Sequence, residues 1–115
     1  MVKEYYFKEG CYIQELHNID GDQDCSIAHV RVEPKQTTRL HALKNTRERY
    51  VILAGHARVT IGQKSWLVKA KDVVQIDENT PQKIENLLGE DLLFLAVCTP
   101  RFKEKNYYEV SSKME

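Results

Sequence analysis

The sequence predicts an all-β fold, either an antiparallel sandwich or a barrel, and two observations predict it. Nine short segments are rich in Val, Ile, Leu, Tyr and Thr, the residue types enriched in strands. Turn-forming residues separate these segments at a spacing of roughly eight to twelve residues, which is typical of sandwiches and barrels. Nine strands in about ninety residues leave little room for helix. In order, the segments are 11–18, 25–33, 37–43, 49–54, 57–61, 65–69, 73–76, 82–86 and 92–99.

Six of the eight boundaries between segments carry clusters of turn-forming residues. Gly supplies positive φ angles, Pro fixes φ, and Asp and Asn side chains bond to nearby backbone, so clusters of these residues end strands. The clusters lie at residues 20–24 (DGDQD), 33–35 (EPK), 54–56 (AGH), 62–64 (GQK), 77–79 (DEN) and 88–90 (LGE). After Pro100 the chain turns polar. There we expect a short polar arm around Tyr107 and Tyr108, either a short helix or a packed segment, followed by a disordered end.

Length and composition predict one domain. A chain of 115 residues, 42% hydrophobic and 30% charged, can bury a core without disulfides or a structural metal. We therefore expect residues 1–115 to form a single domain, with the barrel over about 11–102 and the arm over 103–115. The three cysteines are an odd number without a CxxC pair, so free thiols are expected.

Charge and hydropathy exclude some partners. Seventeen basic and seventeen acidic residues cancel to a formal net charge of zero, so no field exists that would gather nucleic acid or an anionic membrane. The first residues lack the apolar core of a signal peptide, and the longest apolar run, 92–98, is too short to span a bilayer. We expect a cytoplasmic protein.

Two neighbouring segments carry the residues with metal-binding chemistry. Strand alternation places Arg39, His41 and Leu43 on one face, and Glu48 shares a face with Tyr50 on the next segment. If the two strands pair, an imidazole and a carboxylate converge inside the barrel, and such a pair can hold a divalent cation. The alternative is that His41 and Glu48 hydrogen-bond each other in a cavity without metal.

The spacing of these residues resembles the first motif of the cupin superfamily. That motif runs Gly, five residues, His-x-His, three or four residues, Glu, six residues, Gly. Here Lys35 stands at the first glycine, His41 and Leu43 at the two histidines, Glu48 at the glutamate and Gly55 at the last glycine. Three of the five key positions match.

The second cupin motif survives in its spacing more than in its residues. It runs Gly, five residues, Pro-x-Gly, two residues, His, three residues, Asn. Lys71, Asp77, Asn79, Gln82 and Asn86 occupy these positions in order, and only Asn86 keeps the residue type, while Asn suits a turn in place of Gly. The resemblance covers about residues 11–102.

The resemblance implies a double-stranded β-helix, or jelly-roll barrel, with a metal held inside. This chain keeps His41 and Glu48 as ligands, and Gln82 can offer an amide oxygen or serve only as a polar lining residue. The resemblance therefore implies a weakly held divalent transition metal, Fe, Mn, Ni, Cu or Zn, on these three residues. Cupins also commonly form dimers, so a homodimer is expected.

Other residues are expected to contact a ligand. Arg39 shares the parity of His41 and can point its guanidinium at an anionic ligand or remain solvated. Ligand contacts are also expected from Tyr50, Leu43 and Asn86. Leu43 otherwise fills the core.

Two function classes follow. The first is a small-molecule-binding cupin for a small polar molecule, with a weak or incomplete metal site. The second is a metal-dependent enzyme, a dioxygenase or an isomerase of a small polar metabolite, that uses open coordination positions. A regulatory sensor without a DNA-binding domain is less favoured. The fold alone does not choose between these classes.

Overall fold

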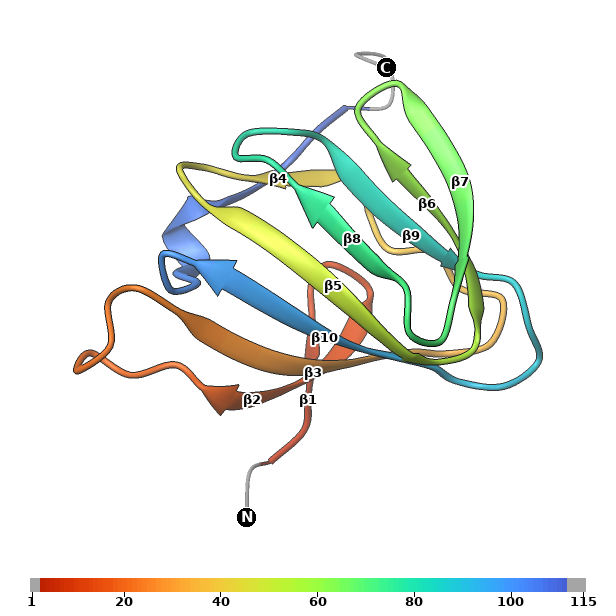
Figure 1. Ribbon diagram of the computed structural model, residues 1–115, viewed down its shortest axis with the longest axis horizontal. Coiled ribbons are helices and arrows are strands. Elements are labelled where there is room, and N and C mark those ends of the chain that lie inside the picture. Colours follow the sequence, from red (N-terminus) through yellow and green to blue (C-terminus); the bar gives the residue numbers. More distant parts are fainter. Residues whose placement is uncertain (1–2, 112–115) are drawn as a thin grey trace.

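A computed structural model describes residues 3–111 and shows two antiparallel sheets that lie face to face (Figure 1). The six-stranded sheet has the order β1-β2-β3-β10-β5-β8, and the five-stranded sheet has the order β11-β4-β9-β6-β7. The strands of the first sheet are β1 (Tyr5–Phe7), β2 (Cys11–His17), β3 (Ser26–Val32), β10 (Leu92–Thr99), β5 (Arg47–Ala54) and β8 (Val73–Ile76). Those of the second are β11 (Tyr107–Glu109), β4 (His41–Leu43), β9 (Gln82–Asn86), β6 (His56–Ile61) and β7 (Lys64–Lys69). The all-β prediction is confirmed.

Every predicted segment contains a strand, and two further strands of three residues occur near the chain ends. The predicted strand over 37–43 was too long, because only His41–Leu43 is a strand. Before it, Thr38 N–H bonds to the carbonyl of Ile84 and Arg39 N–H to that of Glu9, so this stretch is held by bonds to two different elements. The predicted arm contains a 3-10 turn, η1 (Glu104–Asn106), and then β11, which pairs with β4. The expected disordered end lies largely outside the described residues.

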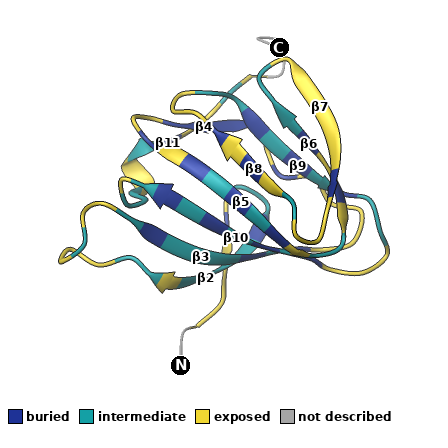
Figure 2. Ribbon diagram, in the orientation of Figure 1, coloured by how far each residue is buried: buried dark blue, intermediate teal, exposed yellow. Residues whose placement is uncertain are grey.

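The core lies between the two sheets and follows strand alternation. On β10 the inward residues Leu92, Phe94, Ala96 and Cys98 are buried, while the residues between them are half-buried (Figure 2). Inward residues of β3, β5, β6 and β9 complete the same core. Burying each large apolar side chain contributes roughly 1.5–3 kcal/mol, so this layer is the main source of stability.

The positions where the cupin motifs have glycine keep the backbone that glycine favours. Lys35, Lys71 and Asn79 have φ angles of 63°, 80° and 62°. Gly55 has a φ angle of 107°. A left-handed conformation costs a residue with a side chain roughly 1–2 kcal/mol. The turns of the motif thus persist although three of the four residues are not glycine.

We expect Gly55→Ala to destabilise the protein by about 1–3 kcal/mol. A Cβ there would lie 3.3 Å from the Cα atom of Leu92 and 3.2 Å from its Cδ1 atom, and the positive φ adds strain. Urea unfolding measures the loss. Gly89→Ala is the matched control, because a Cβ at Gly89 meets nothing within 4 Å and should leave stability nearly unchanged. Equal effects at the two sites would contradict the explanation.

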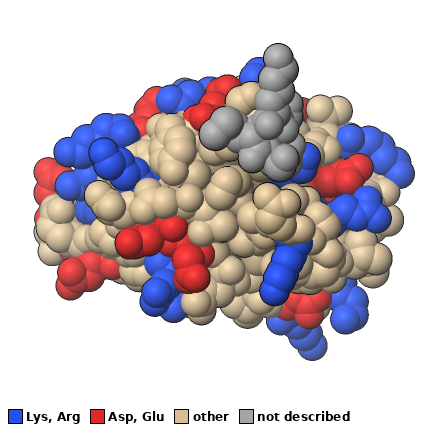
Figure 3. Space-filling model, turned by 90° about the horizontal axis from the view of Figure 1, so that it is seen from above, with Lys and Arg blue, Asp and Glu red and all other residues tan. Residues whose placement is uncertain are grey.

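The surface shows no single-sign field on the face seen in Figure 3. Lys and Arg side chains alternate with Asp and Glu side chains around uncharged surface, in agreement with the formal net charge of zero. Within residues 3–111, no helix is long and apolar enough to cross a bilayer.

Candidate functional site

A cavity of about 40 Å³ lies inside the barrel, where β1, β2 and β3 meet β4, β5 and β10. One ordered water requires roughly 10–15 Å³ on such a measure, so the space holds a few waters or part of a small molecule. Its wall carries three carboxyl groups and one imidazole: Glu9 from the turn after β1, Glu15 from β2, Glu48 from β5 and His41 from β4. Most of the remaining wall is apolar or aromatic.

His41 is fixed in one orientation by the backbone before it. Its Nδ1 lies 2.6 Å from the carbonyl oxygen of Arg39, so Nδ1–H donates there and Nε2 carries the lone pair. The ring is 1% exposed and stacks on Tyr107 of β11, with centroids 5.1 Å apart. Burial lowers the pKa of His41, which favours the neutral imidazole.

Glu9 faces the free nitrogen of this imidazole. Its Oε1 lies 3.3 Å from His41 Nε2, and its Oε2 is within 3.7 Å of the Cys11 thiol. Burial raises the pKa of Glu9 to about 7, so near neutral pH a protonated Glu9 can donate to Nε2. The bond from Arg39 N–H to the Glu9 carbonyl holds this turn against the segment before β4.

Glu48 is the least satisfied polar group in the cavity. It is 7% exposed, and its Oε1 has no hydrogen-bond partner within the part of the chain that the structure describes. Its Oε2 lies 3.7 Å from the Cys98 thiol, a weak donor, and the Gln82 side chain is a second hydrogen-bonding neighbour of the carboxyl group. Burial, followed by repulsion from Glu9, raises the pKa of Glu48 to about 7. The cavity thus holds a carboxyl oxygen that lacks a donor.

The amide oxygen of Gln82 accepts a hydrogen bond from Tyr50. The Tyr50 hydroxyl donates to Gln82 Oε1 at 2.6 Å, and both side chains are 1% exposed. Burial raises the pKa of Tyr50 well above its ordinary value, so the hydroxyl keeps its proton and this bond. The oxygen predicted as a metal ligand therefore already accepts a short hydrogen bond.

Of the four residues predicted to contact a ligand, two line the cavity and two lie outside its wall. Leu43 and Tyr50 line the cavity. Arg39 is exposed and is not part of the cavity wall, because the strand whose parity placed it inward begins only at His41. The buried Asn86 amide donates to the carbonyls of Val32, Glu33 and Glu90, away from the cavity. Ligand contacts by Arg39 and Asn86 remain predictions, and neither residue lines this cavity.

The donor set in this arrangement does not fit a metal on three protein ligands. Glu48 Oε1 has no partner and His41 Nε2 has a lone pair that faces Glu9, but Gln82 Oε1 already accepts from Tyr50 and Leu43 has no donor atom. Across residues 3–111, no group of three or more His, Cys, Asp and Glu side chains is arranged to hold a metal ion. His41 and Glu48 are also not hydrogen-bonded to each other, because Nε2 faces Glu9.

Sequence reasoning missed Glu9 and Tyr107. Glu9 sits between Lys8 and Gly10 in a turn, where a carboxylate is expected to be solvated, and no periodic pattern marks it. Tyr107 was placed in the arm without a role, although it covers the face of the His41 ring. Only the pairing of β11 with β4 reveals its position.

Comparison with known proteins shows the family. The model of the cupin domain family matches residues 28–98, and the chain belongs to this family. An uncharacterized protein of Methanocaldococcus jannaschii is 32% identical over 107 residues, which cover 91% of this chain and 86% of that protein.

Solved structures agree on the fold. Oxalate decarboxylase of Lactobacillus farciminis matches with a TM-score of 0.81 and 22% identity, over 95% of this chain and 33% of that one, so this chain spans about a third of that enzyme. The nucleoside dehydratase Pac13 of Streptomyces matches with a TM-score of 0.80 and 15% identity, over 95% of this chain and 84% of that one. KdgF of Halomonas matches with a TM-score of 0.78 and 13% identity, over 90% of both chains. These likenesses show the jelly-roll fold alone.

Proposed function

We propose that this cupin binds a small polar molecule in the barrel cavity, as a cytoplasmic protein. One observation carries the proposal, the buried Glu48 Oε1 that lines the cavity and has no partner among the described residues. Leaving a buried polar atom unpaired costs roughly 1–3 kcal/mol, and more when it is charged. A bound molecule that donates to this oxygen would remove that cost. Perturbed carboxyl groups in a cleft are also a common mark of functional sites.

The test is to identify what the protein carries. Protein purified without an affinity tag would be analysed by native mass spectrometry and then denatured to release small molecules. We expect a bound species that is absent from Glu48→Gln protein prepared in the same way. Identical small-molecule content in the two proteins would overturn the assignment of this cavity as the binding site.

The second candidate is a metal-dependent cupin enzyme, a dioxygenase or an isomerase of a small polar metabolite. Two features favour it: the imidazole whose Nδ1 is held by a carbonyl, as metal-binding histidines usually are, and the unpartnered oxygen of Glu48. When bound, a metal there would supply Lewis-acid or redox chemistry. His41, through Nε2, and Glu48 would be its protein donors, and Glu9, which faces Nε2 at 3.3 Å, would have to leave that position.

We expect metal content well below one ion per chain. The reason is that only two donors are available without breaking the bond from Tyr50 to Gln82. Elemental analysis of untagged protein, purified without chelator, measures the content, and His41→Ala protein is the matched control. A near-stoichiometric transition metal that disappears in His41→Ala would favour the enzyme. A metal retained in His41→Ala would lie elsewhere.

We also propose a homodimer that uses the free sheet edges. β7 and β8 are edge strands of their sheets, and they expose Trp66, Leu67 and Val73. Exposed edges with apolar side chains favour pairing with a second chain. Size-exclusion chromatography with light scattering should give twice the 13.4 kDa of one chain. A single-chain mass at micromolar concentration would contradict the dimer.

A further inference from the structure

The charged side chains of the cavity wall are all of one sign. They are Glu9, Glu15 and Glu48, with His41 as the one other ionisable side chain besides tyrosine and cysteine, and the described wall includes no Lys or Arg. Arg39, the cation predicted to face the ligand, is exposed outside it. An anion in this cavity would lose its hydration and meet carboxyl groups with no cation to compensate.

Among these three carboxyl groups, only Glu48 has a buried oxygen without a hydrogen-bond partner in the described residues, although its other contacts include the Cys98 thiol and the Gln82 side chain. Glu9 has His41 Nε2 at 3.3 Å and the Cys11 thiol at 3.7 Å. Glu15 has the Asn18 amide at 3.4 Å and a hydrogen bond from the Tyr5 hydroxyl. Glu48 Oε1 has none among residues 3–111, and its side chain is more than nine-tenths buried. The cavity therefore offers one strong acceptor to a donor from outside.

The rest of the wall fits an apolar body. Phe7, Ile13, Val30, Phe94 and Phe102 contribute carbon surface around the carboxyl groups. A strongly hydrated metal ion gains nothing from such a surface, whereas an alkyl or aryl group is stabilised in proportion to the apolar area that it removes from water. Aromatic rings also attract an organic cation through their faces.

We propose that the cavity binds a small organic ammonium ion, an inference that rests on the proposed binding function. The ammonium N–H groups donate to Glu48 Oε1, and the apolar part of the ion packs against the aromatic and aliphatic wall. A hydroxyl group would satisfy the oxygen but leave the charge of a carboxylate uncompensated in a buried site. An ammonium group satisfies both requirements in one charge-assisted bond.

The test compares three probes of nearly equal size and different charge: propylammonium, 1-propanol and propionate. Each is titrated into the ¹⁵N-labelled full chain at pH 8, and amide chemical shifts around the cavity report binding. Propylammonium is expected to bind at least tenfold more tightly than 1-propanol, and propionate is expected not to bind. In Glu48→Gln the preference for the cation over 1-propanol disappears. Glu78→Gln, at an exposed site outside the cavity, should retain the wild-type order of affinities.

The other outcomes distinguish failure of the ammonium inference from failure of the proposed binding function. Binding of 1-propanol or propionate as tight as that of propylammonium overturns the ammonium inference and leaves a binding cavity. If no probe shifts the cavity amides, both the inference and the proposed binding function fail. A preference for the cation that survives in Glu48→Gln places the ion elsewhere and overturns the assignment. Mn²⁺ that displaces propylammonium from the cavity would make it a metal site.

Discussion

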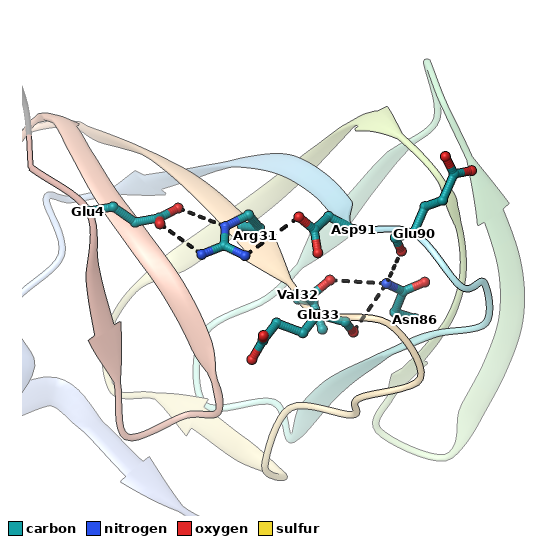
Figure 4. Close-up of polar contacts among 7 residues, drawn as sticks. All are labelled: Glu4, Arg31, Val32, Glu33, Asn86, Glu90 and Asp91. Atoms are coloured by element: carbon teal, nitrogen blue, oxygen red, sulfur yellow. Dashed lines mark hydrogen bonds and ion pairs between the residues drawn. The ribbon is translucent and has the colours of Figure 1, made fainter.

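Asn86→Asp is expected to lower the free energy of unfolding by about 3–5 kcal/mol. The Asn86 amide nitrogen donates to the carbonyls of Val32, Glu33 and Glu90, at 3.0, 3.2 and 2.7 Å (Figure 4). The substitution replaces this donor by a carboxylate oxygen that faces three acceptors in a buried site. An uncompensated buried charge costs roughly 3–5 kcal/mol. Urea unfolding at neutral pH, followed by circular dichroism, measures the change.

Gln36→Glu is the matched control for Asn86→Asp. It makes the same change from amide to carboxylate in an exposed residue, whose backbone carbonyl accepts from Asn86 N–H. Its effect should stay within about 0.5 kcal/mol, as for most surface substitutions. If Asn86→Asp were as mild as this control, the amide would not hold the end of β3 to the connection between β9 and β10, as its geometry indicates.

Glu48→Gln is expected to stabilise the protein at pH 8 and to have little effect at pH 4.5. The folded protein raises the pKa of Glu48 to about 7 from an ordinary value of 4.5, so the folded state binds the proton more tightly than the unfolded state. Stability from this group is therefore fully present below pH 4.5 and is lost as the pH rises through 7. At ~1.36 kcal/mol per pKa unit, the loss amounts to about 3 kcal/mol, and glutamine avoids it.

Unfolding by urea at pH 4.5 and at pH 8 measures this difference. The groups that face or lie near Glu48 all remain in the variant, so the comparison isolates the one carboxyl group; they are His41, Glu9, Tyr50, Gln82, Cys11 and Cys98. Glu78→Gln is the control, since Glu78 is exposed. A stability gain for Glu48→Gln that is the same at both pH values would show that desolvation of the carboxylate is not its cause.

Strand alternation and spacing predicted most of the fold. The predicted segments became strands because each of them buries an alternate row of apolar residues in one core, as β10 does. The missed strands β1 and β11 have three residues each, too short for alternation to be visible, and pairing to β2 and β4 forms them. The register of the two cupin motifs held even where Lys35 and Lys71 replace glycine.

The site was harder to predict because it depends on contacts between segments distant in sequence. His41 and Glu48 were found from spacing, and both line the cavity. Glu9 reaches His41 only because the turn after β1 bonds to the backbone of Arg39. Arg39 was predicted to point inward because a strand was expected to include it, but β4 begins only at His41. The Tyr50 hydroxyl donates to Gln82 Oε1, and the spacing of residues in the sequence does not reveal this hydrogen bond.

The backbone turns of the two cupin motifs persist at Lys35, Lys71 and Asn79. Their side chains share no chemistry with the hydrogen atom of glycine, yet all three backbones adopt φ angles between 62° and 80°. At these positions the residue type differs from the glycine of the cupin motifs, whereas the backbone dihedral angle is one that glycine favours. In this chain, left-handed turns at constant spacing are kept at positions where the glycine side-chain type is not.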